Sequence, residues 1–198
     1  MAHDTPSAWV RRFIPLIRPG GRVLDLAAGG GRHTRLLLDM GFVVTAVDRD
    51  IAGLHPLASG KCDLRALDLE SGPPERALGP LGGFDGVVVT NYLHRPLFAP
   101  IAAAMASGGV LIYETFAAGN ERFGRPRNPD FLLRRGELIA AFAVLTIIAF
   151  EEGEVTRPRP AFVQRIAALA GPLGRLPESD TELDATRRLA GGEPAPAA

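Results

Sequence analysis

One stretch decides the fold of this chain: Val23-Leu24-Asp25-Leu26-Ala27-Ala28-Gly29-Gly30-Gly31-Arg32-His33. A short apolar run leads into three consecutive glycines, and a helical pattern follows. This order is typical of the strand, tight turn and helix that open a nucleotide-binding α/β fold. Glycines let the backbone turn sharply and approach a ligand closely. The stretch therefore predicts a βαβ unit with a ligand-binding turn.

The acidic residue of this stretch indicates which ligand the turn holds. Asp25 lies four residues before Gly29. In dinucleotide-binding versions of the fold a pyrophosphate lies over the turn, at the N-terminus of the helix. A carboxylate would repel a pyrophosphate, whereas it would attract a ligand with an ammonium and a sulfonium group. We interpret the loop as a site for S-adenosylmethionine; the alternative is a buried acid that fixes the loop backbone.

Length and composition predict a single domain. The chain has 198 residues, of which 46% are apolar, and this is enough to bury a core. The formal net charge is zero, so nothing indicates a nucleic-acid partner.

The single cysteine, Cys62, cannot form an internal disulfide, which favours a cytoplasmic location, and we find no signal sequence. No apolar run is long enough for a membrane span. We expect one domain over residues 1–170 and a loosely ordered tail over 171–198, which is rich in Pro, Gly and Ala.

The pattern of apolar residues predicts alternating strands and helices. Strands are expected near 22–26, 42–47, 63–67, 84–90, 110–115, 144–150 and 161–168. Helices are expected near 6–17, 32–40, 51–57, 96–106 and 136–142, with a short one possible after Pro73. The alternation favours a three-layer α/β domain with a mainly parallel seven-stranded sheet. The last two strands are joined without room for a helix, so the last strand is expected to be antiparallel.

These features, in this order, resemble the class I S-adenosylmethionine-dependent methyltransferases over roughly residues 8–168. The resemblance is strongest to small bacterial enzymes of the tellurite-resistance and small-molecule type. It implies the Rossmann-like fold of that class. The family's first motif, an acidic residue followed by spaced glycines, matches Asp25, Ala27, Gly29 and Gly31. Ala27 departs from the usual glycine, but alanine is small and tolerates a negative φ, so we expect binding to survive.

The resemblance also implies cofactor contacts after the next strands. Asp48 closes the second strand, where a carboxylate accepts hydrogen bonds from both ribose hydroxyls. Asp68 and Leu69 follow the third strand and correspond to the residues that meet the adenine amino group and ring. Asn91 belongs to the motif after the fourth strand. The alternatives are a turn or helix-capping role for Asp48 and ordinary loop polarity for Asp68.

The methyl acceptor should lie over the ends of the fourth and fifth strands, because ligands of open α/β sheets bind outside the carboxyl ends of the strands. This places Asn91, Tyr92, His94 and Glu114 near the transferred methyl group. His94, with Tyr92 as a second candidate, is the predicted catalytic residue, because histidine titrates near neutrality. A base is needed only for a neutral hydroxyl or a protonated amine. The alternative for His94 is an exposed residue at a helix start.

A polar segment over 117–130 follows the fifth strand and is expected to fold over the acceptor pocket. Arg122 and Arg125 would then contact an anionic acceptor, bidentately if it is a carboxylate or phosphate. The alternative is a solvated loop whose arginines cover apolar surface. The four histidines and one cysteine show no metal-ligand spacing, so no metal is expected.

The sequence thus predicts an enzyme that transfers a methyl group from S-adenosylmethionine to a small molecule. Three alternatives stay open. The first is an NAD(P)-dependent oxidoreductase, disfavoured by Asp25 and by Thr34, which stands where the dinucleotide motif has its third glycine. The second is a non-catalytic cofactor-binding or scaffold protein. The third is a nucleic-acid methyltransferase, disfavoured by the neutral charge. The sequence identifies neither the acceptor nor the oligomeric state.

Overall fold

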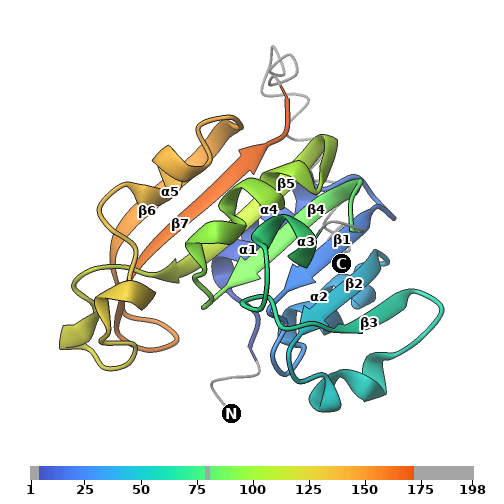
Figure 1. Ribbon diagram of the computed structural model, residues 1–198, viewed down its shortest axis with the longest axis horizontal. Helices are drawn as coiled ribbons and strands as arrows, with labels where there is room; N and C mark the ends of the chain where they lie inside the picture. Colours follow the sequence, from blue (N-terminus) through green and yellow to red (C-terminus); the bar gives the residue numbers. More distant parts are fainter. Residues whose placement is uncertain (1–4, 79–80, 172–198) are drawn as a thin grey trace, which may run out of the picture.

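The computed structural model describes residues 5–78 and 81–171, which form one seven-stranded sheet with helices on both faces (Figure 1). The strands are β1 Arg22–Leu26, β2 Val43–Asp48, β3 Cys62–Ala66, β4 Phe84–Thr90, β5 Met105–Phe116, β6 Thr146–Val155 and β7 Ala161–Leu169. The helices are α1 Ala8–Phe13, α2 Arg32–Asp39, α3 Pro74–Ala77, α4 Phe98–Ala103 and α5 Glu137–Ala141. Short 3-10 turns cover Ile14–Leu16, Ala52–Leu57, Arg95–Leu97, Asn120–Arg122 and Pro129–Phe131.

The strand order is β3-β2-β1-β4-β5-β7-β6. Strands β1 to β5 pair in parallel, and β7 pairs antiparallel with both β5 and β6. The predicted fold class, a mostly parallel sheet with an antiparallel last strand, is confirmed. Because the chain moves outward from β1 to β3 and then returns to β4, the order reverses between β1 and β4, where ligands bind in open α/β sheets.

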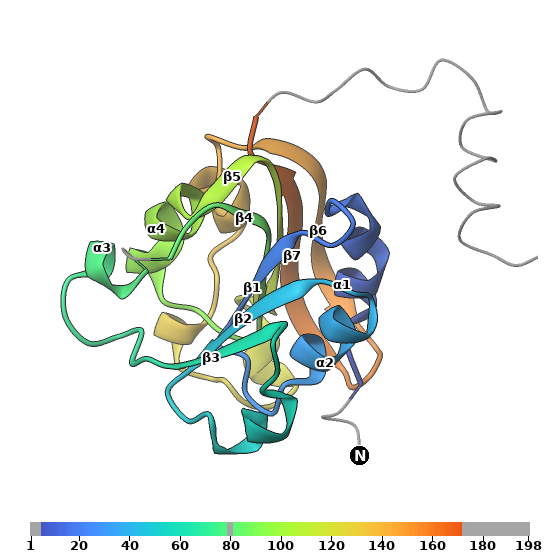
Figure 2. The ribbon, with the colours of Figure 1, turned by 90° about the vertical axis from the view of Figure 1, so that its right-hand side faces the viewer.

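Two apolar layers cover the sheet (Figures 1 and 2). Helices α1 and α2 pack on one face through Trp9, Phe13 and Leu37. Helices α4 and α5 pack on the other face through residues such as Ile101 and Leu138. Strand β4 is buried between them, with unbroken apolar residues over 87–89 that have no exposed surface, as expected for a central parallel strand. Within the described ranges, no helix combines the length and apolarity that crossing a membrane requires.

The N-terminal helix begins and ends where local chemistry dictates. The Ser7 hydroxyl accepts hydrogen bonds from the backbone N–H groups of Trp9 and Val10, which caps α1. The α-helix stops at Phe13 and gives way to a 3-10 turn that contains Pro15. Pro15 has no N–H to donate, so the α-helix does not continue through it.

Two predicted boundaries are wrong. The helix expected over 96–106 is a 3-10 turn followed by α4, and β5 already begins at Met105. The pairing of β4 with β5 shifts register in between, because Gly108 (φ 77°) and Gly109 form an irregular segment. A Cβ on Gly109 would lie 2.7 Å from the Phe84 carbonyl oxygen, so this close approach requires glycine.

Strand β6 also runs to Val155, beyond the expected end at 150. Its acidic second half, 151–154, has the polarity of a loop, but it pairs with β7 in a hairpin. The predicted boundary at 170 between domain and tail stays a prediction, because residues 172–198 lie outside the described part of the chain.

Candidate cofactor and acceptor sites

The glycine loop is tied to the end of β2. The Gly29 N–H donates to Asp48 Oδ2 at 2.7 Å, and the Ala28 N–H donates to the Val47 carbonyl. Gly31 has φ 78°, and a Cβ there would lie 2.6 Å from Leu54 Cδ2. The loop therefore needs glycine at 31 for packing and conformation together. Asp48 therefore positions the glycine loop, and it also lines the cavity described below.

The backbone at Ala27 differs from the expectation. Its φ is 56°, not negative, and Asn91 at the end of β4 has φ 55°. Among the described residues, these are the non-glycine positions with positive φ. The turn after β1 is so tight that the chain adopts the left-handed conformation despite the alanine side chain, whereas asparagine tolerates it. Strain of this kind is typical of functional sites, and both positions follow neighbouring strands.

A cavity of about 270 Å³ lies over the C-terminal ends of β1 to β4. It is lined by Ala27, Asp48, Arg49, Leu67, Asp68, Leu69, Glu70 and Tyr92. The structure thus brings together four predicted cofactor residues from three separate loops, and it adds Arg49, Leu67 and Glu70, which the sequence analysis missed. Each of these three is adjacent in sequence to a motif residue, and this adjacency was the signal that could have found them. We call this the cofactor pocket.

Asp25 lies beneath the pocket and does not line it. Its side chain is 2% exposed, and Oδ2 accepts a 2.6 Å hydrogen bond from the Thr34 hydroxyl. Burial raises the pKa of Asp25 from its usual 3.8 to about 6, against the opposing effect of the Thr34 hydrogen bonds. At neutral pH the carboxylate is therefore an anion inside the protein, next to the glycine loop. It makes no direct contact with the cofactor pocket, and its role toward a ligand stays a prediction.

Tyr92 is half-buried and belongs to the wall of the cofactor pocket. Its hydroxyl oxygen is buried and has no hydrogen-bond partner in the described part of the chain. Burial, followed by the negative charge of Glu70, raises the pKa of this phenol strongly. The hydroxyl therefore stays protonated and can only donate or accept a hydrogen bond. A general-base role for Tyr92, which requires loss of that proton, does not fit this environment.

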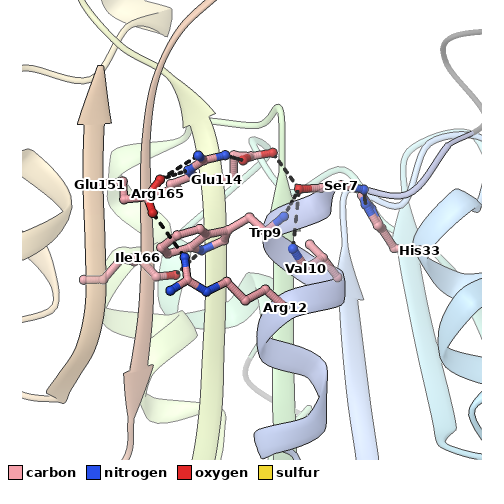
Figure 3. A network of polar contacts seen from close by, with 9 residues as sticks. All are labelled: Ser7, Trp9, Val10, Arg12, His33, Glu114, Glu151, Arg165 and Ile166. Carbon is pink, nitrogen blue, oxygen red and sulfur yellow. Dashed lines mark hydrogen bonds and ion pairs between the residues drawn. The ribbon is translucent and has the colours of Figure 1, made fainter. Parts of the chain in front are cut away.

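Glu114 is engaged in a polar network rather than facing an open pocket (Figure 3). The Ser7 hydroxyl donates to its Oε1 at 2.9 Å, and Arg165 Nη1 donates to its Oε2 at 3.1 Å. Arg165 also pairs with Glu151 at 2.6 Å, and its guanidinium lies 4.9 Å from the centre of the Trp9 ring. The network joins β5, β6 and β7 to the N-terminal helix.

His33 holds the other side of the N-terminal segment (Figure 3). The Ser7 N–H donates to His33 Nε2 at 3.0 Å, and Nδ1 lies 3.3 Å from the Thr90 hydroxyl. Burial lowers the pKa of His33 to about 3, so the ring is neutral, with Nε2 as acceptor and the proton on Nδ1. His33 therefore connects the helix after the glycine loop to the N-terminus and to the end of β4.

The remaining predicted acceptor residues are not gathered into one pocket. His94 is half-buried at the start of the turn before α4 and lines neither cavity. Arg122 is exposed and pairs with Glu154 of β6 at 2.7 Å, and Arg125 is exposed. Their roles stay predictions. No group of three or more His, Cys, Asp or Glu side chains within 5–78 and 81–171 is arranged to hold a metal ion.

The fold, with a glycine loop after β1 and a pocket at the reversal of strand order, is that of the S-adenosylmethionine-dependent methyltransferases. Solved structures with this fold include TehB from Haemophilus influenzae, at TM-score 0.68 and 18% identity, which covers 84% of this chain and 63% of that chain. Another is the 1,6-didemethyltoxoflavin-N1-methyltransferase of Burkholderia thailandensis, at TM-score 0.63 and 22% identity, over 86% of this chain and 80% of that chain. At these identities the likeness establishes the fold, and it confirms the predicted resemblance at that level.

A relative found by sequence is also named as a methyltransferase. A protein-L-isoaspartate O-methyltransferase of Chlorobaculum tepidum is 30% identical over 124 residues, which cover 60% of this chain and 53% of the relative. The chain thus spans about half the length of the curated relative that it matches. No family model matches the chain.

Proposed function

We propose that this protein binds S-adenosylmethionine in the cofactor pocket and transfers its methyl group to a small-molecule acceptor. The observation that carries the proposal is the pocket itself, which lies where the strand order reverses and is bordered by the carboxylates of Asp48, Asp68 and Glu70. Similar structures were determined with S-adenosylhomocysteine or S-adenosylmethionine bound, as in the glycopeptide N-methyltransferase MtfA at TM-scores of 0.57 and 0.56.

The lining residues suit an adenosine group. Asp48 has acceptor capacity left after its bonds to the backbone N–H groups of Gly29 and Asp50, so it accepts from ribose hydroxyls. Leu67 and Leu69 supply apolar contact for the adenine ring, and Asp68 is exposed to meet its amino group. The unpartnered Tyr92 hydroxyl gains a hydrogen bond when a polar ligand enters. The residues present therefore fit the cofactor.

Bound S-adenosylmethionine supplies an electrophilic methyl group on a sulfonium. The protein's own contribution is to orient the acceptor in line with that methyl group and to exclude water. His94 is the proposed general base for acceptors that must lose a proton, because it follows β4 and is partly accessible. The small-molecule acceptor draws support from the bound 1,6-didemethyltoxoflavin in the Burkholderia structure. A cytoplasmic location also stays part of the proposal.

The proposal is tested by calorimetric titration with S-adenosylmethionine, S-adenosylhomocysteine and NAD. We expect the first two to bind and NAD not to bind. Asp48→Asn should weaken S-adenosylhomocysteine binding about 10- to 100-fold, because charged hydrogen bonds to the ribose are lost. Asp39→Asn, an exposed change at the end of α2 outside the pocket, is the matched control and should leave affinity unchanged.

Binding of NAD without binding of S-adenosylmethionine would establish the oxidoreductase alternative instead. Binding of S-adenosylmethionine without turnover on thiol, amine, carboxylate and oxyanion acceptors would favour the non-catalytic alternative. If Asp48→Asn leaves the affinity for S-adenosylhomocysteine unchanged, the nucleoside does not bind in this pocket.

A further inference from the structure

A second cavity, of about 640 Å³, opens at the same edge of the sheet as the cofactor pocket. It is lined by Ala118, Arg135, Gly136, Phe150, Glu152 and Phe162. Ala118 follows the end of β5, Phe150 and Glu152 belong to β6, and Phe162 is near the start of β7. Figure 1 shows the segment that connects β5 to α5 alongside these strands. We call this space the second cavity.

One wall of the second cavity is held by a fully buried polar side chain. Gln164 of β7 has no exposed surface; its Oε1 accepts from the Leu138 N–H at 2.9 Å and its Nε2 donates to the Arg134 carbonyl at 2.7 Å. The Gly136 N–H donates to Glu152 Oε2 at 3.0 Å. These bonds fix the backbone on both sides of Arg135, so the position from which this side chain extends is well defined.

The opposite wall is fixed in the same way by Asn120, which is 1% exposed. Its Oδ1 accepts from the Phe162 N–H and its Nδ2 donates to the Pro126 carbonyl, both at 3.2 Å. A Cβ on Gly119 would lie 3.3 Å from the Phe162 ring, so glycine leaves room for that ring. The segment next to Ala118 is therefore pinned to β7.

A partly buried ion pair holds the rest of the segment. Arg95 donates to Glu137 at 2.6 and 2.9 Å, and also to the carbonyls of Asp130 and Leu132 at 2.7 and 2.8 Å. Buried polar groups and ion pairs stabilise a fold little when compared with apolar packing, but they fix geometry. Here they bond to the irregular backbone around one cavity, and this arrangement preorganises the cavity for a ligand.

The lining specifies the chemistry of that ligand. Phe150 and Phe162 are half-buried aromatic side chains on adjacent strands. The Arg135 guanidinium is exposed and makes no hydrogen bond or ion pair with the residues described, 5–78 and 81–171. Glu152 lines the same cavity, where one of its oxygens accepts the Gly136 N–H, and among the residues described it forms no ion pair with Arg135.

We propose that the second cavity binds a flat aromatic small molecule that carries a carboxylate, with its ring against Phe150 and Phe162 and its carboxylate on Arg135. Arginine pairs with carboxylates bidentately, and aromatic rings pack in offset or edge-on contact. In this proposal Arg135 is the arginine that selects an anionic ligand, and the roles predicted for Arg122 and Arg125 stay predictions. The assignment of this ligand as the methyl acceptor rests on the proposed function; the binding site itself does not.

The test compares aromatic carboxylates with their uncharged amides on the full chain, for example indole-3-acetate with indole-3-acetamide and benzoate with benzamide. Binding is measured by ligand-observed NMR and calorimetry. We expect the carboxylate of at least one pair to bind about 10-fold more tightly than its amide. Arg135→Gln should reduce this ratio to about 1, whereas Arg134→Gln, the neighbouring exposed arginine outside the cavity lining, should leave it unchanged. Phe162→Leu should weaken both members of the pair and keep the ratio.

The proposal is overturned if no pair shows a preference for the carboxylate, or if Arg134→Gln removes the preference as Arg135→Gln does. S-adenosylhomocysteine titrated into the same samples separates the two proposals. Carboxylate binding without S-adenosylhomocysteine binding removes the proposed function and keeps the second cavity as a ligand site. S-adenosylhomocysteine binding without a preference for the carboxylate keeps the cofactor pocket of the proposed function and removes the second cavity as a carboxylate site.

Discussion

The two ends of the sheet are stabilised in different ways. Around the cofactor pocket the decisive contacts join residues close in sequence, such as Asp25 with Thr34, nine residues apart, and Gly29 with Asp48, nineteen apart. Around the second cavity most of them join residues 26 to 42 apart, as in Gln164 with Leu138 and Phe162 with Asn120. The contacts of Gly136 with Glu152 and of Asn120 with Pro126, 16 and 6 residues apart, are the shorter ones. A site built from short-range contacts leaves a motif in the sequence, whereas one built from long-range contacts does not.

The N-terminal segment connects the helix after the glycine loop to strands β5, β6 and β7. Ser7 bonds to His33, which follows the glycine loop, and to Glu114, which is 107 residues away in β5. Arg165 links Glu114 onward to Glu151 of β6 (Figure 3). None of these residues lines the cofactor pocket or the second cavity, and the two cavities share no lining residue, so the difference between the regions can be tested by changes that affect one of them and leave the other intact.

The largest expected effect is at Asp25, in the cofactor region. Its pKa is about 6 in the folded protein and near 3.8 when unfolded, so the folded state holds the extra proton between these values. The contribution of Asp25 to the free energy of unfolding should therefore be highest below about pH 4, fall as pH rises, and level off above about pH 7, lower by about 3 kcal/mol. His33, whose pKa burial lowers to about 3, contributes with the opposite sign over much of the same range, so the effect of Asp25 is measured as the difference between wild type and Asp25→Asn in urea unfolding from pH 4 to 8. Asp25→Asn should be the more stable protein at pH 8, and its advantage should shrink as pH falls toward 4.

The same variant tests the electrostatic interpretation of the glycine loop. If the buried carboxylate attracts the sulfonium, Asp25→Asn weakens binding of S-adenosylmethionine more than binding of S-adenosylhomocysteine, which lacks that charge. Equal losses for both ligands, or no loss, would leave Asp25 as an acid that only fixes the loop through Thr34. Binding of carboxylates in the second cavity is the internal control and should not change.

The sequence predicted most of the fold, and several of the residues that line the cofactor pocket, for identifiable reasons. Strands β1 and β4 match their predicted bounds because both are rich in buried apolar residues, which in β4 form an unbroken run over 87–89. Asp48, Asp68 and Leu69 lie in one pocket because Asp48 ends β2 and the other two come within three residues of the end of β3. The bulge at Gly108–Gly109 was missed, because an irregular segment next to a helix has no periodicity.

The acceptor side was predicted less well because its side chains are selected by tertiary contacts. Nothing in the sequence around Arg122 or Arg135 distinguishes the arginine that pairs with Glu154 from the one that lines the second cavity. Glu114 was expected to face an acceptor, but Ser7 and Arg165 occupy both of its oxygens. Such pairings are set by sheet order, which the sequence does not state.

An intermediate effect is expected at Gln164, in the second region. Gln164→Leu keeps the approximate volume but leaves the Leu138 N–H and the Arg134 carbonyl without their partner, so the free energy of unfolding should fall by about 2 kcal/mol. Carboxylate binding in the second cavity should weaken, and S-adenosylhomocysteine affinity should not. Gln164→Met, which removes the same bonds with a more flexible side chain, should behave alike. A parallel loss of S-adenosylhomocysteine affinity would show that the two regions are not separable.

The smallest expected effect is at Ala27, whose φ of 56° is unfavourable for any residue with a Cβ. Ala27→Gly relieves about 1–2 kcal/mol of left-handed strain, and the greater freedom of glycine in the unfolded chain offsets part of it, so stability should rise by about 0.5–1 kcal/mol. Ala28→Gly is the matched control, because Ala28 does not have a positive φ and is 8% exposed; this change should lower stability. Urea unfolding of both variants shows whether each change raises or lowers the free energy of unfolding. If Ala27→Gly also destabilises, the side chain's contact with the cofactor pocket outweighs the strain, and the departure from glycine in the motif is an adaptation of this loop rather than a tolerated defect.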